Sequence, residues 1–125
     1  PFAINNKNTI VGMTQTPAST PGGLPWIWRT GDLELTPLPL PDGVQYVNHL
    51  AINDSEFVVG TGFGESGSTG LIWRNGDVAE LSSLIDSGSF MVTEANDIAA
   101  NGAIAGQVEA VGDPRSGVAA VISSV

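Results

Sequence analysis

The sequence has no cysteine, few basic residues and no long hydrophobic run. Without cysteine the chain can form neither a disulfide nor a zinc–thiolate site. Only 4 of its 125 residues are lysine or arginine, against 13 aspartate and glutamate residues, and the net charge is −9. We therefore expect neither nucleic acid nor an anionic membrane surface as a partner, because both are bound by clustered basic side chains. No apolar stretch approaches the roughly 18 residues of a membrane span, so we expect no membrane insertion.

The rest of the composition is that of a folded domain. Hydrophobic residues make up 42% of the chain, which is too many for an intrinsically disordered sequence. The length of 125 residues is that of one domain, and we assign residues 1–125 to a single repeat domain.

One ten-residue phrase occurs three times without gaps. It reads AINNKNTIVG at residues 3–12, AINDSEFVVG at 51–60 and DIAANGAIAG at 97–106, so the copies are offset by 48 and 46 residues. Each copy keeps a polar centre, a two-residue apolar step and a final glycine. A period in the forties is typical of propeller blades and other repeat arrays.

A second phrase follows the first in the same order. PWIWRTGDLELTPLPL at residues 25–40 matches GLIWRNGDVAELSSLI at 70–85, and the third copy ends as GVAAVISSV. These matches divide the chain into repeats at approximately 2–48, 49–94 and 95–125. Because the sequence starts inside the first copy, we interpret it as a fragment of a longer array.

Each copy predicts short strands separated by turn residues. Asn75–Gly76 lies between two apolar runs, which is a strong hairpin signal because both residues tolerate positive φ. We predict roughly 11 strands in groups of four, four and an incomplete three. The predicted fold class is all-β, with tandem four-stranded antiparallel repeats in about 2.75 copies that resemble β-propeller blades.

These phrases resemble the HAF repeat, an extracellular repeat of bacterial proteins. The family phrase is an Ala-x-x-Ile-Asn-x-x-Gly-x-Ile-Val-Gly pattern, followed by an apolar-Leu-Trp-x-x-Gly step and a leucine ending. The first two copies match both parts, and the third keeps NDIAANGAIAG but has Ile122 near the place of the tryptophan. The resemblance implies a propeller-like array and an extracellular or cell-surface location in bacteria.

Polar residues gather at equivalent places in the first two copies, namely Asn5, Asn6, Asn8, Asn53, Asp54 and Ser55. Their oxygens could ligate calcium. However, Asn and Asp also hydrogen-bond their own backbone in tight turns, and Ala99 and Ala100 fill the third copy. We favour the turn interpretation and predict no metal and no cofactor.

The three tryptophans have different predicted roles. Trp28 and Trp73 recur at one repeat position, so we expect them to pack between sheets. Trp26 lies on the same strand face as Trp28, and Leu71 replaces it in the second copy. Trp26 is therefore the tryptophan we expect to be exposed and able to touch a ligand.

Charged residues flank the predicted hairpin turns of the second phrase. Arg29 and Asp32 in the first copy, like Arg74 and Asp77 in the second, are expected to form cross-strand pairs. The candidate ligand-binding residues are then Trp26, Asp32 and Asp77, and no catalytic residue is assigned.

The leading hypothesis for function is a non-enzymatic extracellular repeat module for binding or assembly. We expect self-association, and a protein or glycan ligand held by the variable segments at 15–24, 42–47, 62–69 and 109–116. The glycine-rich stretch at 62–67 is expected to be a flexible connector. The alternative is a polysaccharide-acting hydrolase or lyase, which requires an acidic groove that holds two of Asp32, Glu34, Asp77 and Glu80.

Overall fold

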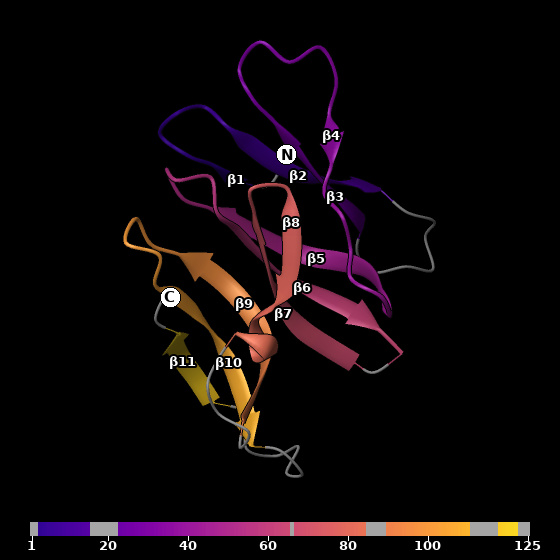
Figure 1. Ribbon diagram of the computed structural model, residues 1–125, viewed down its shortest axis with the longest axis vertical. Helices are drawn as coiled ribbons and strands as arrows, with labels where there is room; N and C mark the ends of the chain where they lie inside the picture. The colour runs from indigo at the N-terminus through magenta and orange to yellow at the C-terminus, as the bar shows by residue number, and fades with distance from the viewer. Residues whose placement is uncertain (1–2, 16–22, 66, 85–89, 111–117, 123–125) are drawn as a thin grey trace.

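The computed structural model describes residues 3–15, 23–65, 67–84, 90–110 and 118–122 (Figure 1). These residues form eleven β-strands and one short 3-10 helix. The strands are β1 (Ala3–Ile4), β2 (Ile10–Gln15), β3 (Gly23–Trp28), β4 (Thr36–Pro37), β5 (Val44–Ile52), β6 (Val58–Gly64), β7 (Gly67–Arg74), β8 (Asp77–Glu80), β9 (Phe90–Ile98), β10 (Ile104–Ala110) and β11 (Val118–Ile122), and the 3-10 helix η1 covers Leu81–Ser83. The prediction of an all-β, antiparallel chain is confirmed.

The strands fall into three groups along the chain, β1–β4, β5–β8 and β9–β11. The first two groups join into one sheet, with the order β1-β2-β3-β5-β6-β7-β8 and β4 paired to β3. That junction is a single residue pair, Gly23 with Val47. The third group is a separate sheet with the order β11-β10-β9, and neither sheet closes on itself within the described residues. Figure 1 shows the groups one after another, with the first at the top and the third at the lower left.

Strand register assigns the residues of each group to two faces, because residues directly opposite in an antiparallel pair share a face. We call one the front face, which carries Ile4, Ile10 and Trp28 in the first group, Ile52, Val58 and Trp73 in the second, and Ile98 and Ile104 in the third. The back face carries Ala3, Val11 and Ile27, then Ala51, Val59 and Ile72, then Asp97 and Ala105.

Two hydrophobic cores join the groups, and both place a back face on a front face. In the first core, Val11 and Ile27 from the back of the first group pack with Val58 and Trp73 from the front of the second. The second core joins the back of the second group to the front of the third, and contains Ala51, Val59, Ile72, Ile98 and Ile104. Removing a fully buried side chain such as Trp73 from such a core typically costs about 3–5 kcal/mol.

The three copies of the first phrase fold into turns with the same hydrogen bonds. The amide of the first turn residue donates to a carbonyl four residues later, from Asn5 to Thr9, from Asn53 to Phe57 and from Ala99 to Ala103. The fourth turn residue adopts positive φ in each case, at 61° for Asn8, 62° for Glu56 and 91° for Gly102.

Asparagine side chains connect one turn to the next. Asn53 Oδ1 accepts the backbone N–H groups of Ser55 and Phe57 at 3.1 and 3.0 Å, which holds its own turn. Its Nδ2 donates to the carbonyl of Ala99 in the third group at 3.1 Å. Asn5 does the same in the first group, and its Nδ2 donates to the carbonyl of Asn53 at 3.0 Å. The turn interpretation of these asparagines is confirmed, and they additionally tie neighbouring strand groups together.

The glycine that ends the phrase is required by close backbone packing. A β-carbon on Gly60 would lie 2.4 Å from the carbonyl oxygen of His49, and one on Gly106 would lie 2.1 Å from that of Glu94. Neither carbonyl can move without disturbing its strand, so a side chain does not fit at either position.

Some local predictions were wrong. The described residues of the stretch 62–67 do not form a flexible connector, because Gly62 and Phe63 pair with Thr69 and Ser68 and extend the β6–β7 hairpin. The stretch DLELTPL at 32–38, whose apolar residues predict a strand after the first hairpin turn, contributes only β4, and Leu33 is 99% exposed. The predicted variable segments at 15–24 and 109–116 lie largely outside the described residues.

No helix in the described part of the chain has the length and hydrophobicity of a membrane span.

The asparagine contacts predict a large effect of one substitution. Asn53→Ala removes three hydrogen bonds and leaves two turn N–H groups without their acceptor, so we expect it to lower the free energy of unfolding by about 3 kcal/mol. The matched control is Asn101→Ala, which removes a single exposed bond to the Ala103 amide and should cost less than about 1 kcal/mol. Urea unfolding measures both, and equal losses would contradict the role given to Asn53.

Candidate functional site

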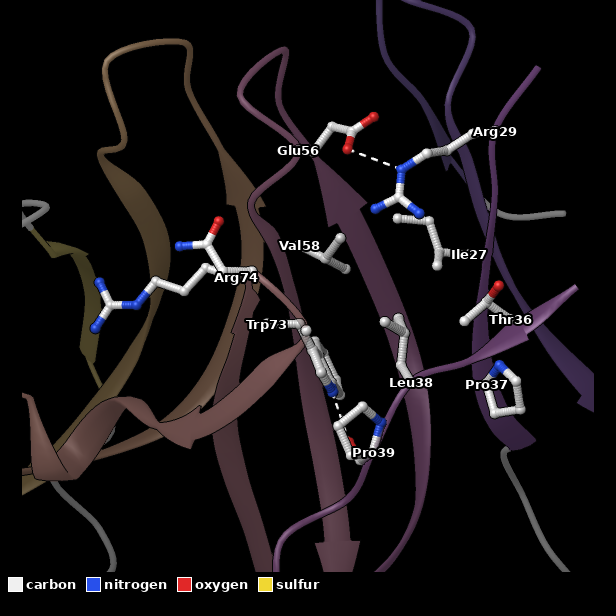
Figure 2. A pocket seen from close by; sticks show the side chains of 12 residues that line it. Ile27, Arg29, Thr36, Pro37, Leu38, Pro39, Glu56, Val58, Trp73 and Arg74 are labelled. Atoms are coloured by element: carbon white, nitrogen blue, oxygen red, sulfur yellow. Dashed lines mark hydrogen bonds and ion pairs between the residues drawn. The ribbon is translucent and has the colours of Figure 1, made fainter. Parts of the chain in front are cut away.

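A cavity of about 190 Å³ lies between the first and second strand groups (Figure 2). Its walls come from β3, β4, β6 and β7 and from the segment that follows β4. The lining residues are Ile27, Arg29, Thr36, Pro37, Leu38, Pro39, Glu56, Val58, Trp73, Arg74, Asn75 and Gly76. The indole of Trp73 is fixed there because its Nε1 donates to the carbonyl of Pro39 at 2.6 Å.

An ion pair lies at one end of this cavity. Arg29 Nε contacts Glu56 Oε1 at 2.9 Å, and Figure 2 shows Arg74 turned away from this pair. Thr9 Oγ1 donates to the other Glu56 oxygen at 2.6 Å. The Thr9 hydroxyl and then the Arg29 guanidinium hold the pKa of Glu56 below its ordinary value. The Glu56 carboxylate therefore serves as a contact between the first and second groups.

A second contact of this kind lies at the neighbouring turn position. Asp54 Oδ1 accepts the backbone N–H of Asn6 at 2.7 Å, and Oδ2 accepts its side-chain amide at 3.0 Å. These two hydrogen bonds lower the pKa of Asp54, the backbone bond more than the side-chain bond. Asn6 and Asp54, considered above as possible calcium ligands, are thus each other's partners. In the described residues no group of three or more His, Asp or Glu side chains could hold a metal ion.

The turns also surround an open groove of about 190 Å³. It is lined by Ile4, Asn5, Asn6, Ile52, Asn53, Asp54, Ile98 and Ala100. Equivalent residues of all three strand groups meet here, since Ile4, Ile52 and Ile98 occupy one repeat position. The groove is therefore a product of the stacking of the three turns.

The three predicted ligand-binding residues do not form one site. Trp26 is half-buried on β3, where it pairs with Gly12 and Pro37. Asp32 lies in the turn after β3, and Asp77 begins β8 in the second group, where it lines a separate cavity of about 220 Å³. Their chemistry as a ligand site remains a prediction.

The prediction of an ion pair between Arg29 and Asp32 across the first hairpin was wrong. The Asp32 carboxylate accepts the backbone N–H of Arg29 at 3.0 Å, and the Arg29 guanidinium binds Glu56 instead. Because the turn already satisfies Asp32, the long arginine side chain is free to reach the next strand group. Sequence spacing gave no signal for this contact, which joins residues 27 positions apart.

The front face of the first strand group exposes apolar residues. The equivalent residues of the other two groups are buried. Ile4 is 58% exposed, whereas its equivalents Ile52 and Ile98 are 9% and 7% exposed. Trp28 is half-buried, whereas its equivalent Trp73 is 2% exposed. The difference arises because the first group covers the front of the second, while no strand group in the described part of the chain covers the front of the first.

The tryptophan predictions need correction on this point. We expected Trp28 to pack between sheets and Trp26 to be the exposed aromatic residue, but both are half-buried on the same uncovered face. Leu71, which takes the place of Trp26 in the second group, is fully buried. The repeat pattern identified the equivalence of these positions but not which copy has a neighbour.

No family model, curated protein or solved structure matches this chain.

The electrostatics of Glu56 predict a pH dependence. A carboxyl whose pKa is lowered by folding contributes stability above its unfolded pKa of about 4.3, and this stability is lost as the pH falls through the folded pKa. We expect the wild-type chain to lose more stability than Glu56→Gln between pH 6 and pH 3, by up to about 1 kcal/mol because the ion pair is partly exposed. Urea unfolding at the two pH values measures this difference, and parallel losses in the two proteins would contradict it.

Proposed function

We propose that this chain is a non-enzymatic extracellular module that acts in assembly or binding through its exposed sheet faces. On this proposal the three strand groups are tandem repeats of a propeller-like array. The resemblance of both phrases to the HAF repeat supports the extracellular location.

The observation that carries the proposal is the uncovered front face of the first group. Ile4, Ile10 and the two tryptophans at 26 and 28 form an apolar surface with a defined strand geometry. Apolar surface of this kind on a folded protein commonly marks an interaction site. Burying it would release water from side chains whose equivalents in the second group are already buried.

Two further features support a role in contacts between sheets. The back-on-front packing occurs twice within the chain, with the same residue positions in each contact. The polar bonds of the turns follow the same direction, because Asn5 and Asn53 each donate to the next strand group. We propose self-association as the primary activity, and a protein or glycan ligand as the other possible occupant of the exposed face.

The alternative of a polysaccharide-cleaving enzyme receives no comparable support. An enzyme of this kind would use two of the carboxylates Asp32, Glu34, Asp77 and Glu80. Among these four, Asp77 alone lines one of the three cavities described above. A glycosidase needs two carboxyl groups across one groove. Glu56, which lies at a cavity, is bound to Thr9 and Arg29.

Light scattering tests the proposal directly. We expect the mean mass of the wild-type chain to rise above the single-chain value of 12.8 kDa with increasing concentration. Ile4→Asp should abolish this rise, because an unpaired carboxylate cannot be buried cheaply in an apolar contact. Leu33→Asp is the matched control, since Leu33 is 99% exposed and belongs to no strand, and it should behave as wild type. A wild-type mass of 12.8 kDa at all concentrations would contradict self-association.

A further inference from the structure

The two contacts between strand groups have the same geometry. Each contact places a back face against the next front face, and this accounts for the backs of the first two groups and the fronts of the last two. Within the described residues, the front of the first group and the back of the third group remain uncovered. Asp97 and Ala105 are exposed on that back face.

We propose that the front face of the first strand group binds the back face of the third group of a second copy, head to tail. This inference rests on the proposed assembly function and specifies its geometry. The contact continues the packing that the chain already uses twice, so it requires no new kind of interface. Such a heterologous contact either closes into a ring or extends as a filament.

The first group offers a backbone acceptor at the position that the two internal contacts use. The carbonyl of Asn53 accepts two hydrogen bonds, from the Glu56 amide and from Asn5 Nδ2 of the preceding group. The equivalent carbonyl of Asn5 accepts the Asn8 amide, and no donor from a preceding group reaches it in the described structure. This oxygen therefore keeps a vacant lone pair for a donor from a second copy. The third group has Ala99 at the donor position, so an asparagine introduced there would supply that donor.

The back of the third group fits the same register but is a weaker partner. Ala105 replaces Val11 and Val59, and Asp97 replaces Ala3 and Ala51, so the surface is smaller and carries a charge. Three of the side chains by which the first group bonds to the second, Asn5, Asn6 and Thr9, become alanines at 99, 100 and 103. We therefore expect a weak assembly whose strength is limited by the back face.

Complementation between two variants of the full chain tests the head-to-tail geometry. Ile4→Asp disables the front face, and Ala105→Asp disables the back face. Both positions are exposed, so both variants should keep the circular dichroism spectrum of the wild type. We expect each variant alone to remain at the mass of one chain in light scattering. An equimolar mixture should give particles of two chains and no larger, because the intact front of one variant binds the intact back of the other.

Other outcomes distinguish the alternatives. If the wild type associates and Ala105→Asp alone still forms dimers, the fronts bind each other, which overturns the head-to-tail geometry but leaves the assembly function intact. If Ile4→Asp alone forms dimers, the back faces bind each other, with the same consequence. If the wild type does not associate at any concentration, the assembly function itself fails.

A gain-of-function variant provides a second, independent readout. Ala99→Asn restores the amide donor that Asn5 and Asn53 supply in the other two groups. One additional hydrogen bond should strengthen association about five- to tenfold. The gain should disappear when Ile4→Asp is added. Unchanged association of Ala99→Asn would overturn the proposed register.

Discussion

The stacking of the strand groups depends on the side chain of Asn53, which bonds both its own turn and the next strand group. A tight turn leaves backbone N–H groups that must find an acceptor, and Asn53 Oδ1 accepts two of them. This fixes the amide plane, so Nδ2 points to the carbonyl of Ala99 in the next strand group. Asn5 repeats the arrangement one group earlier. Because the local turn and the distance between groups are set by the same side chain, the three groups stack in one register.

This arrangement has a direction, and its two ends are unlike. The series of amide donors begins at Asn5 and stops at Ala99, which has no side-chain donor. The first group offers an apolar front, while the last offers a small back face with Asp97 on it. A charge on an exposed sheet is a common means by which natural proteins limit uncontrolled association. In the head-to-tail contact proposed above, the unlike ends make the contact specific and keep it weak.

Much of the fold could be predicted because its signals are local or periodic. The Asn75–Gly76 hairpin depends on two neighbouring residues, and both adopt positive φ. Contacts between groups were harder, because they depend on which face is covered. Trp28 and Trp73 have nearly the same sequence context, yet Trp73 is buried because the first group lies over it. The bond between Arg29 and Glu56 could not be predicted, since it requires the stacking of two groups.

The two internal contacts are similar in packing but differ in their polar reinforcement. Glu56 adopts a φ of 62°, a backbone conformation that costs a residue other than glycine or asparagine about 1 kcal/mol. Its carboxylate offsets this cost by bonding Thr9 and Arg29 across the first contact. Gly102 occupies the same position in the third group, where the turn is unstrained but offers no side chain to the second group. The first contact is therefore sensitive to pH and salt through this ion pair. The second contact is held by its apolar core, by the amide of Asn53 and by the Thr61 hydroxyl, which bonds the backbone of Ala95.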